Sequence, residues 1–155
     1  MQRDQEVTFR EATPDDLPGI VRLLADDPLG ATRETPAGTV PETYLAAFAA
    51  ITQSADNILV VAEVGGALAG TMQLTYIPGL TYTGGLRAQI EGVRVAAEQR
   101  GRGIGQSMIG WAIERARERG CRLIQLTTDR QRPESVRFYQ KIGFRPSHMG
   151  MKLHL

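Results

Sequence analysis

The sequence is short of cysteine and of long apolar runs, and each shortage excludes a class of protein. Its single cysteine, Cys121, cannot form a disulfide within the chain. No apolar run reaches the roughly 20 residues of a membrane-spanning helix, and residues 1–10 lack the basic start and apolar middle of a signal peptide. We therefore expect a cytoplasmic protein in which Cys121 is a buried, inert thiol.

The sequence also lacks an excess of charge of either sign. It contains 18 Lys and Arg residues against 17 Asp and Glu residues, which gives a formal net charge of +1. This balance argues against nucleic acid or a membrane surface as a partner, so any anion-binding site has to be local. The two histidines, His148 and His154, have the wrong spacing for a metal pair on a helix, and we predict no metal site.

Length and periodicity predict one domain, residues 1–155, that is large enough to bury a core. Apolar residues that alternate or run together predict strands, and apolar residues three or four apart predict helices. The predicted order is strand 6–11, helix 13–27, a helix from residue 39, strands 57–64, 67–77 and 86–95, a helix ending at residue 119, strand 121–128, helix 133–142 and strand 148–155.

The turns between these elements predict how the strands pair. Glycines at 65–66 and Pro-Gly at 78–79 predict two successive hairpins, and therefore an antiparallel meander. The strands at 86–95 and 121–128 are joined through a helix and are expected to be parallel. The prediction is thus an α/β (α+β) domain with a mixed, mostly antiparallel sheet of six to seven strands and helices on both faces.

The segment V-R-V-A-A-E-Q-R-G-R-G-I-G at residues 93–105 organises the rest of the chain. It predicts a strand, a glycine-rich loop and the start of a helix. Glycine lets the backbone approach a ligand closely, and the unpaired N–H groups at a helix start can bind an anion. Arginines at two loop positions add positive charge. The residues concerned are Arg100, Gly101, Arg102, Gly103 and Gly105.

Two nucleotide-binding motifs do not fit this loop. A nucleotide-hydrolase P-loop needs a lysine, but the first lysine of the chain is Lys141. A dinucleotide fingerprint needs glycine where Gln106 or Met108 stands. The loop therefore binds another phosphate-bearing ligand, or it is an ordinary glycine-rich connection with surface arginines.

The loop R-G-R-G-I-G at residues 100–105 resembles the Q/R-x-x-G-x-G/A signature of the GNAT superfamily of N-acetyltransferases. The V-R-V at 93–95, the F-Y-Q-K-I-G-F at 138–144 and the order of the elements match further parts of the family pattern. The resemblance implies a GNAT-like acyl-CoA N-acyltransferase fold. It also implies an enzyme that moves the acetyl group of acetyl-CoA to a primary amine by direct attack in a ternary complex.

In that family the strand before the loop pairs with the pantetheine arm, the loop binds the pyrophosphate, and a splay from the next strand admits the cofactor. Asp129 departs from the usual asparagine and, when ionised, cannot donate a hydrogen bond. For Ser135, near a helix start, a local backbone contact is the alternative. The implied acetyl-CoA contacts are Val93, Arg94, Val95, Arg100, Gly101, Arg102, Gly103, Ile104, Gly105, Gln106, Asp129 and Ser135.

Two residues are candidates for proton transfer. Tyr139 matches the tyrosine of the family pattern, which implies a general acid that protonates the departing thiolate. Alternatively its ring packs and its hydroxyl bonds a neighbour. Glu91 interrupts an apolar stretch beside the expected splay and is the candidate general base, acting directly or through water. A solvated or structurally paired glutamate is the alternative.

The acceptor stays open between a small amine, an amino acid, an antibiotic and a protein amine. The segments that would select it, residues 29–40 and 79–87, carry no decisive residue, and for Tyr76 and Tyr82 ordinary packing is the alternative to lining a pocket. The resemblance also allows a homodimer. The rival interpretations are an acyl-CoA-binding sensor without turnover and a nucleic-acid-binding domain, and the charge balance disfavours the second.

Overall fold

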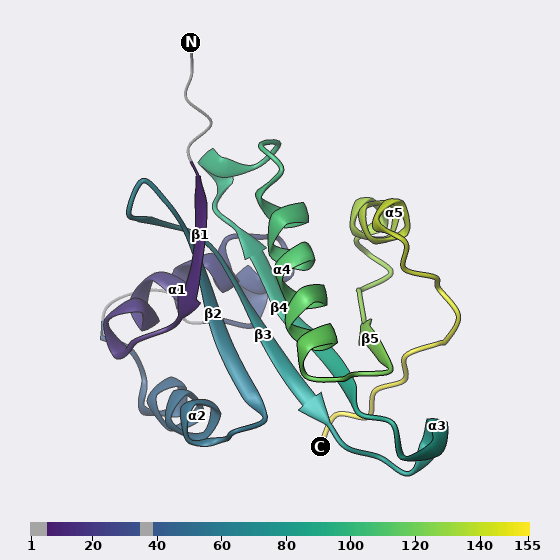
Figure 1. Cartoon of the computed structure of the whole chain (residues 1–155). Helices are drawn as coiled ribbons and strands as arrows, with labels where there is room; N and C mark the ends of the chain where they lie inside the picture. The colour runs from purple at the N-terminus through teal and green to yellow at the C-terminus, as the bar shows by residue number, and fades with distance from the viewer. Residues whose placement is uncertain (1–5, 35–38) are drawn as a thin grey trace.

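Five strands form one sheet in a computed structural model that describes residues 6–34 and 39–155. Neighbours in sequence are neighbours in the sheet, so its order is β1-β2-β3-β4-β5 (Figure 1). The first three pairs are antiparallel and β4·β5 is parallel, as the predicted helical crossover requires. The strands are β1 (Val7–Glu11), β2 (Asn57–Val64), β3 (Ala67–Ile77), β4 (Arg87–Val95) and β5 (Leu123–Leu126).

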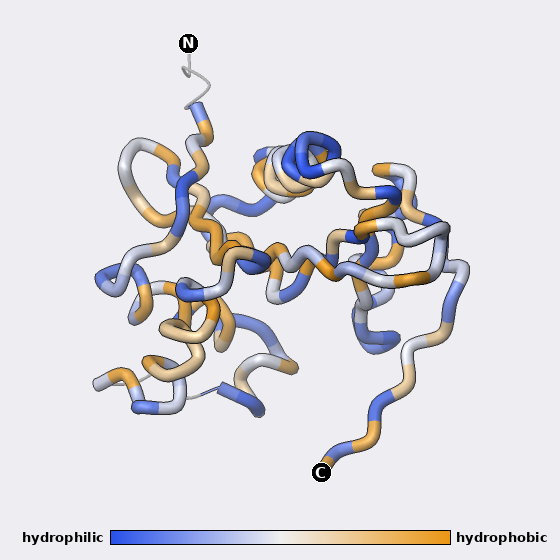
Figure 2. The backbone as a smooth tube through the Cα atoms, turned by 60° about the horizontal axis from the view of Figure 1, so that its bottom comes forward, coloured by the Kyte–Doolittle hydropathy of each residue, from blue (hydrophilic) through white to orange (hydrophobic). Residues whose placement is uncertain are grey.

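Helices cover both faces of the sheet, which confirms that prediction. One face carries α1 (Leu17–Ala25) and α2 (Glu42–Gln53), and the other carries α4 (Ile104–Glu118) (Figures 1 and 2). None of the helices in the described ranges is long and apolar enough to cross a membrane. The remaining helical segments are α3 (Thr81–Gly84), α5 (Pro133–Ile142) and the 3-10 turns η1 (Pro14–Asp16), η2 (Gly30–Thr32) and η3 (Ala97–Gln99).

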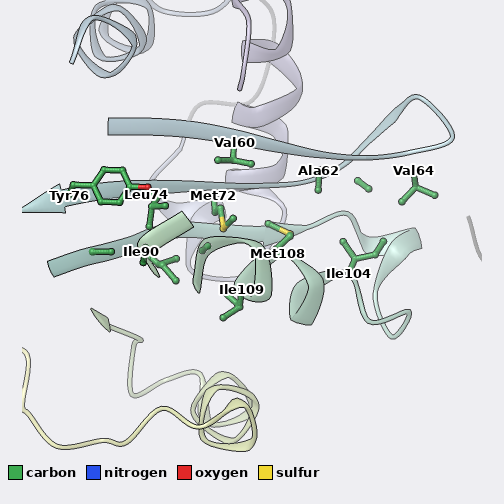
Figure 3. Close-up of a cluster of buried hydrophobic side chains, with 14 residues drawn as sticks. Val60, Ala62, Val64, Met72, Leu74, Tyr76, Ile90, Ile104, Met108 and Ile109 are labelled. Atoms are coloured by element: carbon green, nitrogen blue, oxygen red, sulfur yellow. The ribbon is translucent and has the colours of Figure 1, made fainter. Parts of the chain in front are cut away.

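The nearly continuous apolar run of β2 is buried on both faces of the sheet. Val60 packs with Met72, Met108 and other residues in the cluster between the sheet and α4 (Figure 3). The next residue, Val61, points to the opposite face and packs with Ile20 of α1. Two cores therefore hold the sheet between its helices, and the α4 core fixes the end of β4 from which the glycine loop begins.

Two sequence predictions about the ends of elements are wrong. The described part of the chain contains five strands, not six to seven, because residues 145–155 form neither strand nor helix. Alternating polar and apolar residues favour an extended chain with one apolar side, but they do not supply a strand to pair with it. The expected helix start at Thr39 is also displaced: α2 begins at Glu42, with Pro41 at its cap.

Candidate active site

Strands β4 and β5 part halfway along β4. Their pairing ends where Ile90 faces Leu126, whereas β4 continues to Val95. Gly92 has a φ of 61° and lies in a bulge, because the register of β4 against β3 shifts by one residue at this point. Beyond Ile90 the edge of β4 that faced β5 therefore has no strand partner in the described chain. This is the expected splay.

The glycine loop lies directly after the end of β4. Gly101 and Gly103 have φ values of 75° and 78°, in the left-handed region that favours glycine. A Cβ atom at either position would meet nothing within 4 Å, so one side of the loop is open. The first bond of α4 runs from Ser107 N–H to the Gly103 carbonyl at 3.0 Å, and the preceding N–H groups lie at the free helix start. The loop can accept an anion of phosphate size.

Gly105, the third glycine, serves a different purpose. A Cβ atom there would lie 3.4 Å from Phe138 Cζ and 3.8 Å from Val95 Cγ2. Gly105 thus lies where α5 meets the first turn of α4 and the end of β4. This contact brings the neighbouring residue of α5, Tyr139, close to the splay and the loop.

The two loop arginines take different positions. Arg100 donates from Nε to the Val95 carbonyl at 3.2 Å and from Nη2 to the Asp26 carbonyl at 3.1 Å. Its guanidinium therefore ties the loop to the end of β4 and to the end of α1. Arg102 is exposed on the open side of the loop. Of the two, Arg102 is the one free to meet an incoming phosphate.

Tyr139 is half-buried among aromatic rings and near two arginines. Its ring makes edge contacts with Phe138 and Phe144, at centroid distances of 5.1 and 5.8 Å. Burial raises the pKa of Tyr139, and the positive charges of Arg94 and Arg132 act in the opposite direction. Tyr139 is thus a protonated hydroxyl at neutral pH, and its neighbours stabilise the anion that would remain after it gave up its proton.

An aspartate that sequence analysis missed connects three elements near Tyr139. Asp27, just after α1, lies 2.9 Å from Arg132 Nη2 at the start of α5 and 2.8 Å from Arg94 Nε on β4. The second pair is in contact but is not aligned as a hydrogen bond, so Arg94 Nε and Asp27 Oδ2 have no hydrogen-bond partner within the described chain. The N–H groups of Leu29 and Gly30 donate to Asp27 Oδ1. We call Asp27, Arg94 and Arg132 the Asp27 cluster.

The charges and N–H groups around Asp27 outweigh its desolvation. Burial alone would raise the pKa of Asp27, but the Gly30 N–H, the charges of Arg94 and Arg132, and the Leu29 N–H lower it overall. No local pattern predicts this cluster, because the two arginines are distant in sequence from Asp27. In the sequence, Asp27 reads only as part of a helix end.

The other predicted site residues are more dispersed. Glu91 is exposed and faces Gln73 across the β3·β4 pair, so it is not in the half-buried position that its apolar neighbours suggested. Asp129 accepts a hydrogen bond from the Gln131 N–H at 2.9 Å, and the Ser135 N–H donates to the Arg132 carbonyl. The Asp129 carboxylate therefore closes a turn at the entry to α5, whereas the Ser135 bond involves only its main chain.

Several residues predicted to contact acetyl-CoA could do so only through their backbone, because their side chains lie in the core. Ile104 is buried in the α4 core, and Val93 and Val95 pack against it. Gln106 is exposed at the start of α4. The side chain of Arg94 points instead to the Asp27 cluster. For the three apolar residues, any contact with a cofactor would come from N–H and C=O groups.

The segments considered for acceptor binding do not meet at the splay. Tyr76 is 4% exposed in the core and lies under Arg119, with its ring centroid 4.6 Å from the guanidinium. Tyr82 is exposed in the β3–β4 connection, at the opposite end of β4 from the glycine loop. Of the segment 29–40, residues 35–38 lie outside the described residues. The described part contributes η2 beside the Asp27 cluster.

Two curated enzymes match segments of this chain. Aminoalkylphosphonate N-acetyltransferase from Salmonella typhimurium is 37% identical over 60 residues, which cover 39% of this chain and 39% of that protein. Glucosamine 6-phosphate N-acetyltransferase from Trypanosoma brucei brucei is 33% identical over 90 residues, or 58% and 59% of the two chains. The matched segments thus span less than two thirds of either relative.

Broader matches cover most of the chain. The crystal structure of a transcriptional regulator from Bacillus halodurans C-125 is 51% identical and superposes with a TM-score of 0.94, covering 97% of this chain and 100% of that one. The family profile described as acetyltransferase (GNAT) family matches residues 20–144. These residues include β4, the glycine loop and Tyr139. The chain therefore belongs to the GNAT family of acetyltransferases.

Proposed function

We propose that this protein transfers the acetyl group of acetyl-CoA to a primary amine. The observation that carries the proposal is the position of Tyr139. Phe138, the preceding residue of α5, lies next to Gly105, and the charge of Arg94 on β4 acts on the Tyr139 hydroxyl, which supports a position of this tyrosine near the loop and the splay. A free strand edge, an anion-accepting helix start and a proton donor thus lie at one end of β4, which is the set of groups that acyl transfer from a thioester requires.

The residues present fit acetyl-CoA. The open side of Gly101 and Gly103 leaves room for the pyrophosphate at the start of α4, and Arg102 adds a positive charge there. The free edge of β4 from Glu91 to Val95 offers N–H and C=O groups to the pantetheine arm. When bound, acetyl-CoA supplies an acetyl group already activated as a thioester.

Two different residues carry out the two proton transfers at the reacting carbonyl. The amine nitrogen forms the new C–N bond and loses a proton to Glu91, directly or through water. The C–S bond breaks, and the Tyr139 hydroxyl protonates the departing sulfur. The charges of Arg94 and Arg132 stabilise the resulting phenolate until it is reprotonated from solvent.

The role of Glu91 can be tested through the pH dependence of turnover. If Glu91 is the base, Glu91→Gln is expected to lower kcat/KM by at least about 10-fold and to remove the acidic limb of its pH profile. Glu98→Gln, which changes another exposed acid close to the glycine loop, serves as the matched control and is expected to leave the profile intact. An unchanged profile in Glu91→Gln would assign the proton to another group or to water.

A second candidate is an acyl-CoA-binding sensor without turnover. The observation in its favour is the solved relative from Bacillus halodurans, which is described as a transcriptional regulator. The fold and the cofactor site would be the same in both cases, so neither feature separates an enzyme from a sensor. Only turnover separates the two candidates.

The deciding experiment is a screen for acetyl-CoA consumption across amine classes. The set includes amino acids, aminoglycosides, peptides with a free N-terminus or lysine, and, because of the two curated relatives, an aminoalkylphosphonate and glucosamine 6-phosphate. We expect one class to raise thiol release well above the rate with buffer alone. Tight acetyl-CoA binding without turnover on any amine would favour the sensor instead, and failure to bind acetyl-CoA would exclude both.

A further inference from the structure

Positive charge is in excess around Asp27, beside the splay. Arg94 belongs to the part of β4 that has lost its strand partner, and Arg132 precedes α5. Arg33, at the end of η2, adds a third positive charge that reaches Arg94. Burial, together with the charges of Arg132 and Arg33, lowers the pKa of Arg94, although Asp27 acts in the opposite direction. Three arginines against one ionised aspartate leave two positive charges in excess.

Asp27 does not use up the donors of these arginines. A guanidinium offers several N–H groups in one plane. Within the described residues Arg132 donates one hydrogen bond, from Nη2 to Asp27 Oδ1 at 2.9 Å. Arg33 donates only from Nε, to a backbone carbonyl at 3.1 Å. Arg94 donates from Nη1 to a carbonyl of its own strand, and its contact with Asp27 is not aligned as a hydrogen bond. The remaining N–H groups at the guanidinium ends are available to an oxyanion.

An anion bound at these arginines does not come from acetyl-CoA. The phosphates of acetyl-CoA are separated from its thioester by the uncharged pantetheine arm, and the proposed function puts the pyrophosphate at the glycine loop. The charges of Arg94 and Arg132 act instead on the hydroxyl of Tyr139, the residue proposed to protonate the departing sulfur. A group held by these arginines therefore lies near the thioester end of the site, which the amine has to reach.

We infer, on the basis of the proposed function, that the acceptor is an amine that also carries a carboxylate, phosphonate or phosphate, and that Arg94 and Arg132 bind this anionic group. Guanidinium groups bind such oxyanions through paired, charge-assisted hydrogen bonds. A dianion balances the two excess charges of the arginines, and a carboxylate leaves one of them beside Tyr139. A polycationic amine such as an aminoglycoside is repelled by the same charges.

Acceptors that differ only in charge test the inference by turnover. Amino acids and aminoalkylphosphonates of several chain lengths are each compared with the amino alcohol of the same length, and glucosamine 6-phosphate is compared with glucosamine. We expect at least one anionic amine to exceed its uncharged counterpart in kcat/KM by about 10-fold or more. Turnover that favours the uncharged amine in every pair, or a polycationic amine over all of them, overturns the inference and leaves the proposed acetyl transfer in place.

Substitution of the arginines tests whether they bind the anionic group. Arg132→Gln is expected to lower the advantage of the anionic amine over its uncharged counterpart by about 10-fold. Arg33→Gln is expected to lower it by about 3-fold, and it leaves the fold intact because Arg33 is exposed. The ratio between the two acceptors is the readout, because any effect on the Tyr139 proton acts on both and cancels.

The matched control is Arg130→Gln, which removes an exposed arginine from the same connection before α5. It is expected to leave the ratio between the two acceptors unchanged. Far-UV circular dichroism checks that each variant is folded. A ratio that stays at the wild-type value in both Arg132→Gln and Arg33→Gln, or that falls equally in Arg130→Gln, overturns the inference.

Calorimetric titration separates this inference from the proposed function. The same amines are titrated into the protein saturated with CoA, so that the glycine loop is occupied and the anion cannot bind there. The anionic amine is expected to bind about 10-fold or more tightly than its uncharged counterpart, and Arg132→Gln is expected to remove this difference. Such binding without turnover on any amine contradicts acetyl transfer and supports the anion site. If Arg132→Gln weakens CoA binding and leaves amine binding unchanged, the arginine serves the cofactor and the inference is overturned.

Discussion

Replacement of Tyr139 by phenylalanine is expected to lower kcat by about 100-fold while the affinity for acetyl-CoA changes by less than about 3-fold. The substitution removes the hydroxyl and keeps the ring, so the edge contacts with Phe138 and Phe144 are retained. Without the phenol the thiolate has to leave unprotonated or take a proton from water. Steady-state rates with the acceptor found in the screen, together with a direct titration of acetyl-CoA, measure the two quantities.

The matched control for this experiment is Tyr82→Phe, which removes a phenol from an exposed position at the other end of β4. It is expected to leave kcat unchanged. A Tyr139→Phe enzyme with normal kcat would show that the ring packs and that the hydroxyl takes no part in the reaction. A loss of acetyl-CoA affinity in step with kcat would make Tyr139 a binding residue.

Local and periodic features of the sequence predicted most of the fold. The spacing of apolar residues changes from helical to strand-like at residue 57, and this change located β2. The helix between β4 and β5 predicted that these two strands are parallel. The same reasoning located the glycine loop, because three glycines at alternate positions between a predicted strand and a predicted helix indicate a loop. The splay was implied by the family resemblance alone, since the periodicity of β5 does not show where its pairing with β4 stops.

Features that depend on distant partners were not predictable from the sequence. Residues 148–155 alternate as a strand does, but whether they pair depends on a free edge elsewhere. Gly105 looked like part of the phosphate loop, yet it packs beside Phe138, which comes from another helix. Glu91 continues the alternation of β4, in which Ala88 and Ile90 are buried on the opposite side, and the sequence does not show what covers the side of Glu91.

The Asp27 cluster supports a second large expected effect, this time on stability. Asp27→Asn is expected to lower the free energy of unfolding by about 2 kcal/mol at pH 7, because it leaves Arg94 and Arg132 partly buried without a counter-charge. Removing one partner of a buried ion pair costs more stability than the pair contributes, because the other charge is left buried. The expected loss is smaller here than for a fully buried pair, because all three side chains retain some exposure. Urea unfolding of both proteins measures the difference.

The pH dependence separates the charge of Asp27 from its packing. The pKa of Asp27 is lowered in the folded protein, so its charge stabilises the fold fully above the unfolded pKa of about 4, and this contribution is lost as the pH falls through the folded pKa. The gap between wild type and Asp27→Asn is therefore expected to be largest near pH 7 and to shrink below about pH 4.

The adjacent acid provides the control, because Asp26 is exposed and pairs with Arg100 at 3.6 Å. Asp26→Asn is expected to leave the free energy of unfolding nearly unchanged. If the two substitutions cost the same, or if the cost of Asp27→Asn does not depend on pH, the cluster acts through its backbone bonds to Leu29 and Gly30 and not through charge. In that case other contacts would hold Arg94 and Arg132 beside Tyr139, and their charges would still act on the pKa of Tyr139 after the loss of Asp27.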